Sequence, residues 1–497
     1  MTIGVLPENV LLDIFDLHLD QVDHVDAWHT LVHVCRQWRE VVFASPRRLN
    51  LQLLCTTKRP VITALGLDIW PALPIVIDSV ATGMQQDMSN IIAALKQHDR
   101  VSQINIQNIP NALYSIFAAM KKPFLSLTEL KISSGFGVVP IVPDSFLGGS
   151  TPQLRTLRLD GIPFPALGKL LLSTSNLVDL DLQRIPHSGY VSPQEIVAGL
   201  SASMGLKKLT LKFQSPQSWD DRSNWDPPPL TRIVLYALTR LVFKGDSQYL
   251  EAIVSRIDAP LLDNLDTTFF DQPTFDTPLL LHLISRTGAF TAFHRAHVDL
   301  HPSSVNVTLF HQKGIHDSET LKLGISCPYY RQLPAAAQLC NSFIPPFPTL
   351  EQLTINGDGT RIRQDDAEAP QWLELLQPFN RVKDLVLRKG SVRFVAHALQ
   401  WLAGERVTET LPVLQNISLV GPQPSGAVKQ ALKKFIAARQ LSGYPVTMNV
   451  VGDCELNSMW DFGSDMRMHW VCGNTEDHAD ALSNVILYLD PPTIHDG

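Results

Sequence analysis

Cysteine is scarce in this chain, and long apolar runs are missing. The 497 residues contain six cysteines, and no two of them form a C-x-x-C pair. This pattern is typical of reduced thiols inside the cell rather than of a disulfide framework, so we expect a cytoplasmic or nuclear protein. No uncharged apolar stretch approaches the roughly 18–20 residues that a membrane span needs, and we expect no secretory signal at the first residues.

Charged residues are also few and nearly balanced. They make up 18% of the chain, and the formal net charge is -7. A broad electrostatic surface for nucleic acid or for anionic membranes is therefore not expected. The acidic excess lies at one end: residues 451–497 hold nine Asp or Glu against one Arg, a net charge of −8, which leaves residues 1–450 at +1.

A chain of this length exceeds one ordinary globular core, so it forms about three domains or one repeat architecture. The apolar template φ-x-x-φ-x-φ, where φ is an apolar residue, recurs along it. Clear copies begin at Val101, Leu127, Leu154, Leu177, Leu206, Leu238, Leu350, Val382 and Leu414, and weaker ones at Leu262 and Leu321. The φ-x-φ end of the template has the period of a strand with one buried face.

Helical patterns fill the intervals between these expected strands. They cover residues 164–175, 192–203, 247–257, 276–287, 369–379 and 391–403. In the second of them, Ser192 precedes Pro193 and is followed three residues later by Glu195, which predicts a capping box at a helix start. Strand and helix thus alternate in units of about 23–32 residues, an arrangement typical of leucine-rich repeats.

We therefore predict an α/β fold in which an irregular leucine-rich-repeat-like solenoid, a horseshoe, forms most of the chain. The repeats lack the regular Asn that commonly closes the turn after each strand, since that position holds residues such as Gly135, Ile162 and Gln214. An open doubly wound sheet also alternates strands and helices. Two observations disfavour it: no glycine-rich phosphate motif follows a strand, and the strands outnumber those of an ordinary sheet.

The first fifty residues follow a different pattern. Apolar residues at helical spacing extend from Val10 to Leu19, after a Leu6-Pro7-Glu8 start that suits a first helical turn. A second apolar cluster extends from Trp28 to Val42 and ends at Ser45-Pro46. Helices this short bury too little surface to be stable alone, so they require the following domain, a partner or both.

These residues closely resemble an F-box. The matching motifs are Leu6-Pro7-Glu8-x-Val10-Leu11-Leu12-x-Ile14-Phe15, Trp28-x-x-Leu31-x-x-Val34-Cys35-Arg36-x-Trp38-Arg39 and Pro46-x-x-Leu49. The rest of the chain, to about Val450, resembles the leucine-rich-repeat-like region of a large group of fungal F-box proteins, with blocks such as Ile185-Pro186-His187-Ser188-Gly189-Tyr190. The implied organisation is an F-box at residues 1–48, the α/β solenoid at residues 49–450 and an acidic tail at residues 451–497.

The resemblance implies the substrate-recognition subunit of a Skp–cullin–F-box ubiquitin ligase. In that family the F-box binds a Skp-type adaptor, and through it a cullin, while the repeats hold a target protein, here unknown. Carried over to this chain, the adaptor-binding residues are Leu6, Pro7, Leu11, Ile14, Phe15, Leu31, Val34 and Trp38. The alternative is an adaptor-bound interaction scaffold without a role in ubiquitination.

Catalytic and metal-binding patterns are weak. His29 and His33 have the i, i+4 spacing of a helical zinc site but lack the adjacent Glu that a metalloprotease uses as base. His294, His297 and His301 belong to a segment that alternates like a strand, which favours solvent-facing side chains over a metal site. No nucleophile elbow or phosphate loop occurs. We therefore expect no enzymatic activity, metal or cofactor, and a metal-dependent hydrolase is the remaining enzyme hypothesis.

Three further segments carry expectations. Residues 425–439 have the pattern of an amphipathic helix, the last of the repeats, followed by a Gly443 stop and a strand at 446–450. The Trp219–Pro229 segment contains two Trp and a proline run, which predicts a loop; a variable surface loop is favoured over a binding loop with the two Trp as anchors. The tail holds Trp460 and Trp470 among its acids, so we expect its first half to fold against the last repeats.

Overall fold

The chain is a mixed α/β protein with a large, mainly parallel sheet. The computed structural model describes residues 6–21, 28–46, 48–57, 73–80, 88–107, 112–135, 139–216, 232–272, 275–311, 319–345, 347–357, 369–404, 406–421 and 424–451. By compactness the chain divides into two units, Met1–Leu262 with Asp276–Leu283, and Asp263–Phe275 with Ile284–Gly497. None of the described helices combines the length and apolar character needed to cross a membrane.

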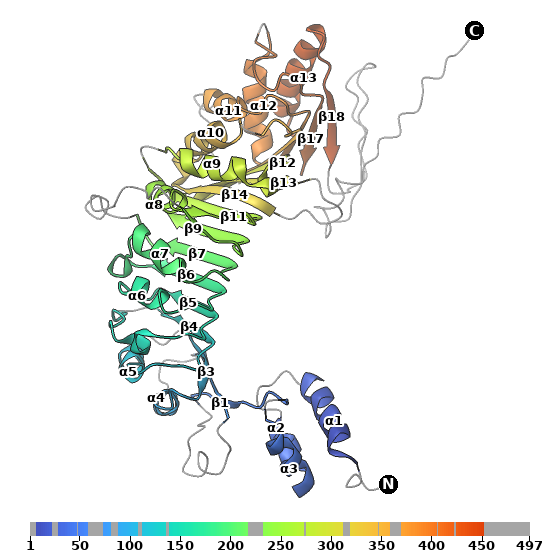
Figure 1. The fold of residues 1–497 in the computed structure, drawn as a ribbon. Coiled ribbons are helices and arrows are strands. Elements are labelled where there is room, and N and C mark those ends of the chain that lie inside the picture. Colours follow the sequence, from blue (N-terminus) through green and yellow to red (C-terminus); the bar gives the residue numbers. More distant parts are fainter. Residues whose placement is uncertain are drawn as a thin grey trace. The chain divides into compact units, whose positions relative to one another are not determined.

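The first unit carries the N-terminal helices and a parallel run of strands (Figure 1). Its helices are α1 Glu8–Gln21, α2 Trp28–Val32, α3 Arg36–Ala44, α4 Ser89–Leu95, α5 Leu113–Ala119, α6 Leu167–Leu171, α7 Pro193–Leu200 and α8 Ser247–Val254. Its strands are β1 Leu53–Cys55, β2 Ile75–Val80, β3 Val101–Gln107, β4 Glu129–Ser133, β5 Thr156–Asp160, β6 Asp179–Ile185, β7 Lys208–Phe213 and β9 Arg240–Gly245, in the spatial order β1-β2-β3-β4-β5-β6-β7-β9. Two short strands, β8 Ile233–Val234 and β10 Ile257–Asp258, pair separately.

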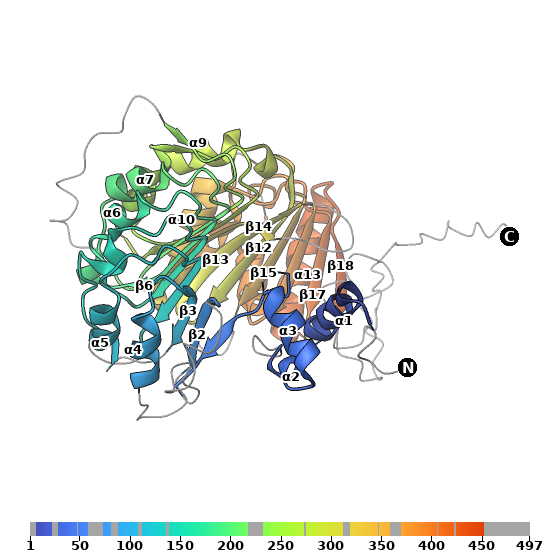
Figure 2. The ribbon, with the colours of Figure 1, turned by 60° about the horizontal axis from the view of Figure 1, so that its bottom comes forward.

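The core of this unit is built from identical register positions on successive strands. Leu130 of β4 lies opposite Leu157 of β5, which lies opposite Leu180 of β6, and both Leu209 and Leu241 continue the same row. All five side chains are fully buried. Helices α4–α7 lie on one side of these strands (Figures 1 and 2), so the alternate strand residues point away from the helices. The strands expected from the template are confirmed here.

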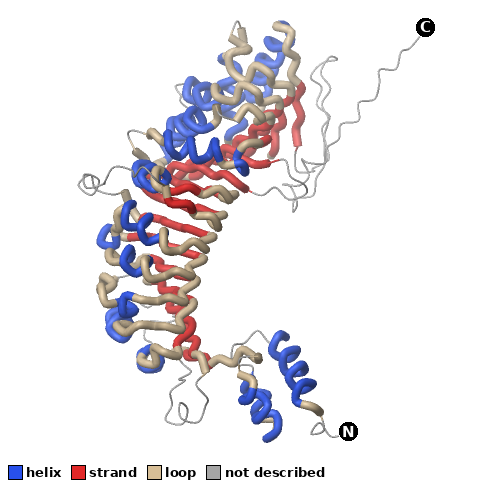
Figure 3. Tube along the Cα trace, in the orientation of Figure 1, coloured by secondary structure: helices blue, strands red, loops and turns tan. Residues whose placement is uncertain are grey.

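The second unit contains the remaining strands and helices (Figure 3). Its strands are β11 Asn264–Phe270, β12 Phe293–His301, β13 Ser304–His311, β14 Glu319–Ser326, β15 Gln352–Gly357, β16 Asp384–Lys389, β17 Asn416–Val420 and β18 Thr447–Val451. Its helices are α10 Gln332–Phe343, α11 Ala369–Leu376, α12 Ser391–Trp401 and α13 Gly426–Leu441, while α9 Pro278–Arg286 contributes residues to both units. The strand order is β11-β14-β13-β12-β15-β16-β17-β18.

The order β11-β14-β13-β12-β15 departs from the expected alternation of one strand with one helix. Strand β13 is antiparallel to both β12 and β14, and His301 and Ser304 form the last register pair of the β12–β13 hairpin. The turn between them therefore consists of two residues, Pro302 and Ser303. Strand β13 was not expected from the template, because its sequence alternates without the leading φ-x-x spacing.

Local signals at helix ends are confirmed where the sequence is explicit. The Ser192 hydroxyl accepts the Glu195 backbone N–H and the Glu195 carboxylate accepts the Ser192 backbone N–H, which completes the capping box at α7. The α13 helix has Ser425 as its N-cap, and Gly443 after it adopts a φ of +84°. Helix α6 is shorter than expected. The Trp219–Pro229 segment and the tail after Val451 lie outside the described residues.

Candidate protein-interaction site

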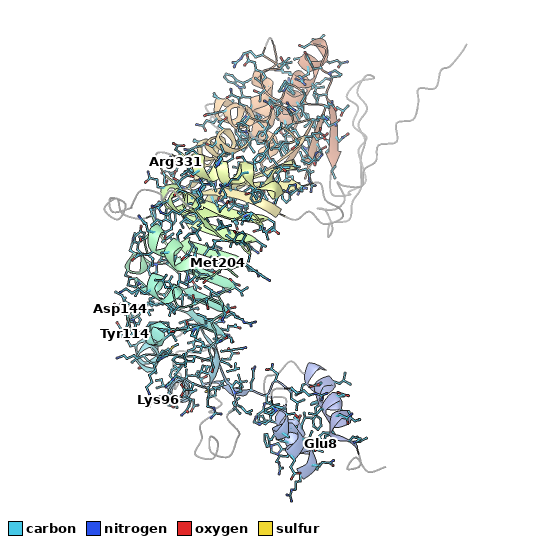
Figure 4. All side chains as sticks on the ribbon, in the orientation of Figure 1. Glu8, Lys96, Tyr114, Asp144, Met204 and Arg331 are labelled. Atoms are coloured by element: carbon cyan, nitrogen blue, oxygen red, sulfur yellow. The ribbon has the colours of Figure 1, made fainter. Side chains whose placement is uncertain are left out.

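The three N-terminal helices form the first candidate site, which begins at Pro7. The Pro7 carbonyl accepts hydrogen bonds from the backbone N–H of Val10 and Leu11, both at 3.1 Å. Pro has no N–H to leave unpaired at a helix start, and the Glu8 carboxylate (labelled in Figure 4) favours the positive end of the helix dipole. Leu6 is half-buried and Pro7 is exposed, so the segment before α1 remains accessible.

Three of the eight expected adaptor-binding residues lie inside the helical cluster. Leu11 and Phe15, one turn apart on α1, are fully buried, and Leu31 on α2 is buried as well. The Phe15 ring meets the Trp38 ring of α3 edge to face, with centroids 4.8 Å apart. Aromatic pairs in this geometry add stability beyond their buried area. In the chain by itself, these three side chains hold the helices together.

Two contacts attach the helices to the segment that follows them. The indole Nε1 of Trp28 donates to the Gln52 carbonyl at 2.7 Å, and the Trp28 side chain is fully buried. Arg48 forms ion pairs with Asp13 and Asp16 on the exposed side of α1. Because the Trp28 bond is buried and the Arg48 pairs are exposed, the Trp28 contact is expected to contribute more to stability.

Other expected residues are exposed. Ile14 on α1 is 39% exposed and Val34, in the turn before α3, is 56% exposed. Leu17, which sequence reasoning missed, is 63% exposed. Its spacing to Val10 and Ile14, i, i+4 and i+7, could have revealed it, because residues at this spacing share one helix face. Apolar side chains exposed on so small a cluster mark a surface able to bind a partner.

Trp38, another of the expected adaptor-binding residues, is partly buried in the helical cluster and partly exposed. Its side chain is half-buried against Phe15, and its backbone N–H is held by the Cys35 Sγ, which caps α3 at 3.5 Å. The Trp38 indole Nε1 is shielded from solvent and finds no hydrogen-bond partner among the described residues. Most buried indole N–H groups have an acceptor, so Trp38 is an exception among the described residues.

His29 on α2 packs against a neighbouring aromatic ring. The His29 ring lies 4.0 Å from the Trp28 ring, centroid to centroid. Burial lowers the pKa of His29, and the nearby His33 lowers it further. Across the part of the chain that the structure describes, no group of three or more His, Cys, Asp or Glu is placed to hold a metal ion.

The histidines of β12 alternate as expected for a strand. Val298 and Leu300 are buried, whereas His297 is half-buried and His301 is exposed on the other face. The His297 ring lies 4.5 Å from the Phe310 ring of β13, centroid to centroid. Burial lowers the pKa of His297 to about 4, so the imidazole is neutral near pH 7.

A second candidate site lies on the strand face of the first unit, at β3–β5. A groove of about 320 Å³ opens there between polar side chains. Its lining residues are Asn105, Gln107, Lys131, Ile132, Ser133, Arg158 and Asp160. None of these residues was a sequence-based candidate, because their proximity depends on the register between strands whose paired residues are 26 or 27 positions apart in sequence.

Bonds within and between strands fix the polar side chains of this face. The Asn105 amide donates to Asp78 at 2.9 Å, and the Gln107 amide donates to Asn105 at 2.9 Å. Arg158 on β5 pairs with Asp181 on β6, Nε to Oδ2, at 3.3 Å. Arg158 and Asp181 are register partners, so opposite charges face each other across the two strands.

Arg184 closes the carboxyl ends of these strands. Its backbone has a φ of +47°, a conformation that residues other than Gly rarely adopt, and β6 is irregular at this point. The Arg184 guanidinium donates to the Asp160 carboxylate on β5 and, at 3.1 Å, to the Ser134 carbonyl after β4. The bond to Asp160 raises the pKa of Arg184. One side chain thus joins three successive strands.

The chain thus exposes the apolar side chains of Ile14, Leu17 and Val34 in its N-terminal helical cluster, and it has a polar groove on the strand face at β3–β5. Comparison with known proteins adds no relative: no protein-family model matches the chain, and no curated protein matches it.

Proposed function

We propose that this chain is the substrate-recognition subunit of a Skp–cullin–F-box ubiquitin ligase. In this proposal residues 1–48 are the F-box, residues 49–450 form the leucine-rich-repeat-like solenoid, and the strand face of the solenoid holds a target protein. The chain itself supplies binding and orientation, not chemistry. By holding a target lysine near the transferring enzyme, it raises the effective concentration of the reacting groups.

The observation that carries the proposal is the exposed apolar surface of α1–α3. Ile14, Leu17 and Val34 are exposed on a helical cluster that already buries Leu11 and Phe15 in its own interior. An apolar surface beyond what the cluster can bury is typical of a binding hot spot. It coincides with the sequence motifs that resemble an F-box.

The test is a pull-down of the full chain with a recombinant Skp-type adaptor. We expect Ile14→Asp and Val34→Asp to abolish capture without unfolding the chain, because both side chains are exposed. Trp38→Ala and Leu6→Ala should each weaken binding by about 2 kcal/mol or more. Tyr114→Asp, at an exposed aromatic residue on α5 (Figure 4), is the matched control and should retain the adaptor.

Capture of the adaptor at wild-type levels by both aspartate variants would contradict the assignment. The scaffold alternative makes a different prediction. If the chain binds the adaptor but no binding partner changes in abundance when the cullin is inhibited, the chain is an adaptor-bound scaffold. Affinity purification with the ligase blocked, followed by mass spectrometry, identifies the partners needed for that comparison.

A further inference from the structure

Strand β18 is the last strand in the order of the second unit (Figures 1 and 2). Its residues Thr447–Val451 lie in parallel register with Asn416–Val420 of β17. Among the residues that the structure describes, no strand pairs with the other side of β18. We call that side the open edge of β18.

The backbone groups on the open edge follow from the pairing with β17. The N–H of Thr447 donates to the Gln415 carbonyl at 2.8 Å, so Thr447 faces β17. In a parallel strand the N–H and C=O of one residue point the same way, and successive residues alternate between the two edges. The N–H and C=O groups of Met448 and Val450 therefore point to the open edge.

Nothing in the sequence of β18 protects this edge. The strand reads Thr-Met-Asn-Val-Val, without a charged residue or a proline. The side chains of Met448 and Val450 are buried, so the strand is fixed in place. An uncharged edge with unpaired N–H and C=O groups is a template for a further strand, and folded proteins usually cover or charge such edges. We therefore expect a strand to cover β18.

The tail, which lies outside the described residues, contains a suitable segment. The apolar template of the repeats recurs there at Leu482, Val485 and Leu487. The run Val485–Leu489 contains Val, Ile and Tyr, which are enriched in strands. It is followed at once by Asp490–Pro492, an acid and two prolines. A charge and prolines are typical of the protected outer strand of a sheet.

The connection from β18 to this segment has a suitable length. A crossover between two parallel strands needs about a dozen or more residues, usually with a helix, and residues 452–481 supply 30. Val485 follows Met448 by 37 positions. Register partners on β16 and β17 are 32 positions apart, as Asp384 and Asn416 are. The tail can therefore form one more unit of the kind that precedes it.

Charge favours the same placement. Residues 452–481 hold seven Asp or Glu and one Arg. Helix α13, which precedes β18 in the chain, exposes Lys433 and Lys434. Neither lysine forms an ion pair with another residue that the structure describes. An acidic crossover beside α13 would lie near two cations, which is a favourable arrangement.

We propose that Leu482–Leu489 binds the open edge of β18 as a further parallel strand. Val485 would lie opposite Met448 and Leu487 opposite Val450, just as Ile417 of β17 lies opposite Met448 on the other side. The Val485 and Leu487 side chains would then continue the buried rows of the sheet. This proposal is independent of the proposed function, because it concerns no residue of α1–α3.

A second copy of the chain is the competing occupant, since an open edge also accepts a strand from another molecule. The tail has the advantage of being tethered. A segment joined to β18 by 30 residues competes at an effective concentration that a separate chain at micromolar concentration does not reach.

Amide hydrogen exchange of the full chain, read at single residues by fragmentation mass spectrometry, tests the pairing. In the proposed register Ile486 donates its N–H to the Met448 carbonyl and accepts the Val450 N–H. Ile486→Pro removes that donor and the strand with it. The Met448 and Val450 amides should exchange at least about tenfold more slowly in wild type than in Ile486→Pro.

Two controls accompany this measurement. Ile494→Pro, beyond Pro491 and Pro492, should exchange like wild type. The Thr447 amide, which bonds to β17, should exchange slowly in every variant and so reports that the sheet itself is folded. Equally fast exchange of Met448 and Val450 in wild type and Ile486→Pro would overturn the proposal. Protection that is lost on dilution, with a dimer mass in light scattering, would overturn it in favour of a second copy.

A cross-link tests the register without disrupting the strand. Asn449→Cys/Ile486→Cys places two thiols on register partners about 4.8 Å apart, within the reach of a disulfide. Mild oxidation and peptide mass spectrometry should find the 449–486 link in large excess over the 449–494 link of the control Asn449→Cys/Ile494→Cys. Equal yields of the two links would mean that the tail lies near β18 only through its tether, and the proposal would be wrong.

Discussion

The carboxylate of Glu251 on α8 accepts the backbone N–H of Leu280, at 2.8 Å, in the first turn of α9. Its second oxygen accepts the N–H of Leu279 at 2.9 Å. Helix α9 begins with Pro278, which has no N–H, so Glu251 satisfies the next two free N–H groups of that turn. A side chain 28 residues earlier in the sequence therefore caps this helix.

Removing this cap should destabilise the fold. Glu251→Ala leaves two backbone N–H groups without an acceptor, and we expect the free energy of unfolding to fall by about 1–2 kcal/mol. Urea unfolding followed by circular dichroism measures the change. Asp144→Ala, at an exposed carboxylate (Figure 4), should leave the midpoint unchanged. Equal midpoints for wild type and Glu251→Ala would show that the cap contributes nothing.

The imidazole of His297 should make stability depend on pH. Burial lowers its pKa to about 4 in the folded chain, whereas an unfolded His titrates near 6.5. Below pH 6.5 the unfolded chain therefore binds a proton that the folded chain does not, and stability is lost as the pH falls toward 4. We expect a loss of about 1–2 kcal/mol between pH 7 and pH 5 after allowance for partial solvent screening.

Urea unfolding of His297→Gln at pH 7 and pH 5 tests this contribution, since the variant should lose less stability than wild type over that interval. His301→Gln, at an exposed histidine of the same strand, is the control and should follow the wild-type curve. A His297→Gln curve parallel to wild type would mean that His297 does not carry the pH dependence.

Arg439 should be among the most sensitive positions of the second unit. Its side chain is 1% exposed, and its guanidinium donates to the carbonyls of Pro412 at 3.1 Å and Leu414 at 2.9 Å. Arg439→Met leaves these carbonyls without a donor, and we expect a loss of about 2–4 kcal/mol in the free energy of unfolding. Arg393→Met, at an exposed arginine on α12, should cost less than about 0.5 kcal/mol.

Gly161 should tolerate no side chain. Its φ is +68°, and a Cβ atom there would overlap the Oγ of Ser134. We expect Gly161→Ala to cost about 1–3 kcal/mol from backbone strain and overlap together. Gly149 has a similar φ of +72° but open space around it, so Gly149→Ala measures the cost of the backbone strain without the overlap. Adding Ser134→Ala to Gly161→Ala removes the overlapping hydroxyl, so the double variant should regain the part of the unfolding free energy that the overlap costs. A double-mutant cycle would show this as non-additivity of the two single changes.

The parallel strands could be predicted because each shows the burial pattern in its own sequence. In β5, Leu157 and Leu159 are buried and Arg158 between them is exposed, which is the alternation that the template describes. The helix starts could be predicted for the same reason: Ser192 and Glu195 form their cap within four residues. Information of this kind is local, and local sequence is sufficient to specify it.

What could not be predicted depends on contacts between distant residues. The place of β13 follows from pairing across two neighbours, as between Asn306 and Asp299, which no single segment encodes. On α1, helical spacing groups Leu11 with Ile14, but only packing against α2 and α3 buries the first and exposes the second. The register that places Lys208 opposite Arg240 is likewise not encoded in either strand alone.

The reversed strand order of the second unit has a consequence for the sequence of folding events. A bond between β16 and β17, from Asn416 to Asp384, joins residues 32 apart, whereas a bond linking β12 to β15, from Asn356 to Asp299, joins residues 57 apart. Closing a longer loop costs more chain entropy and slows the contact. The β12–β13 hairpin, closed by two residues, should form early, and its docking on β15 should be the late step of this unit.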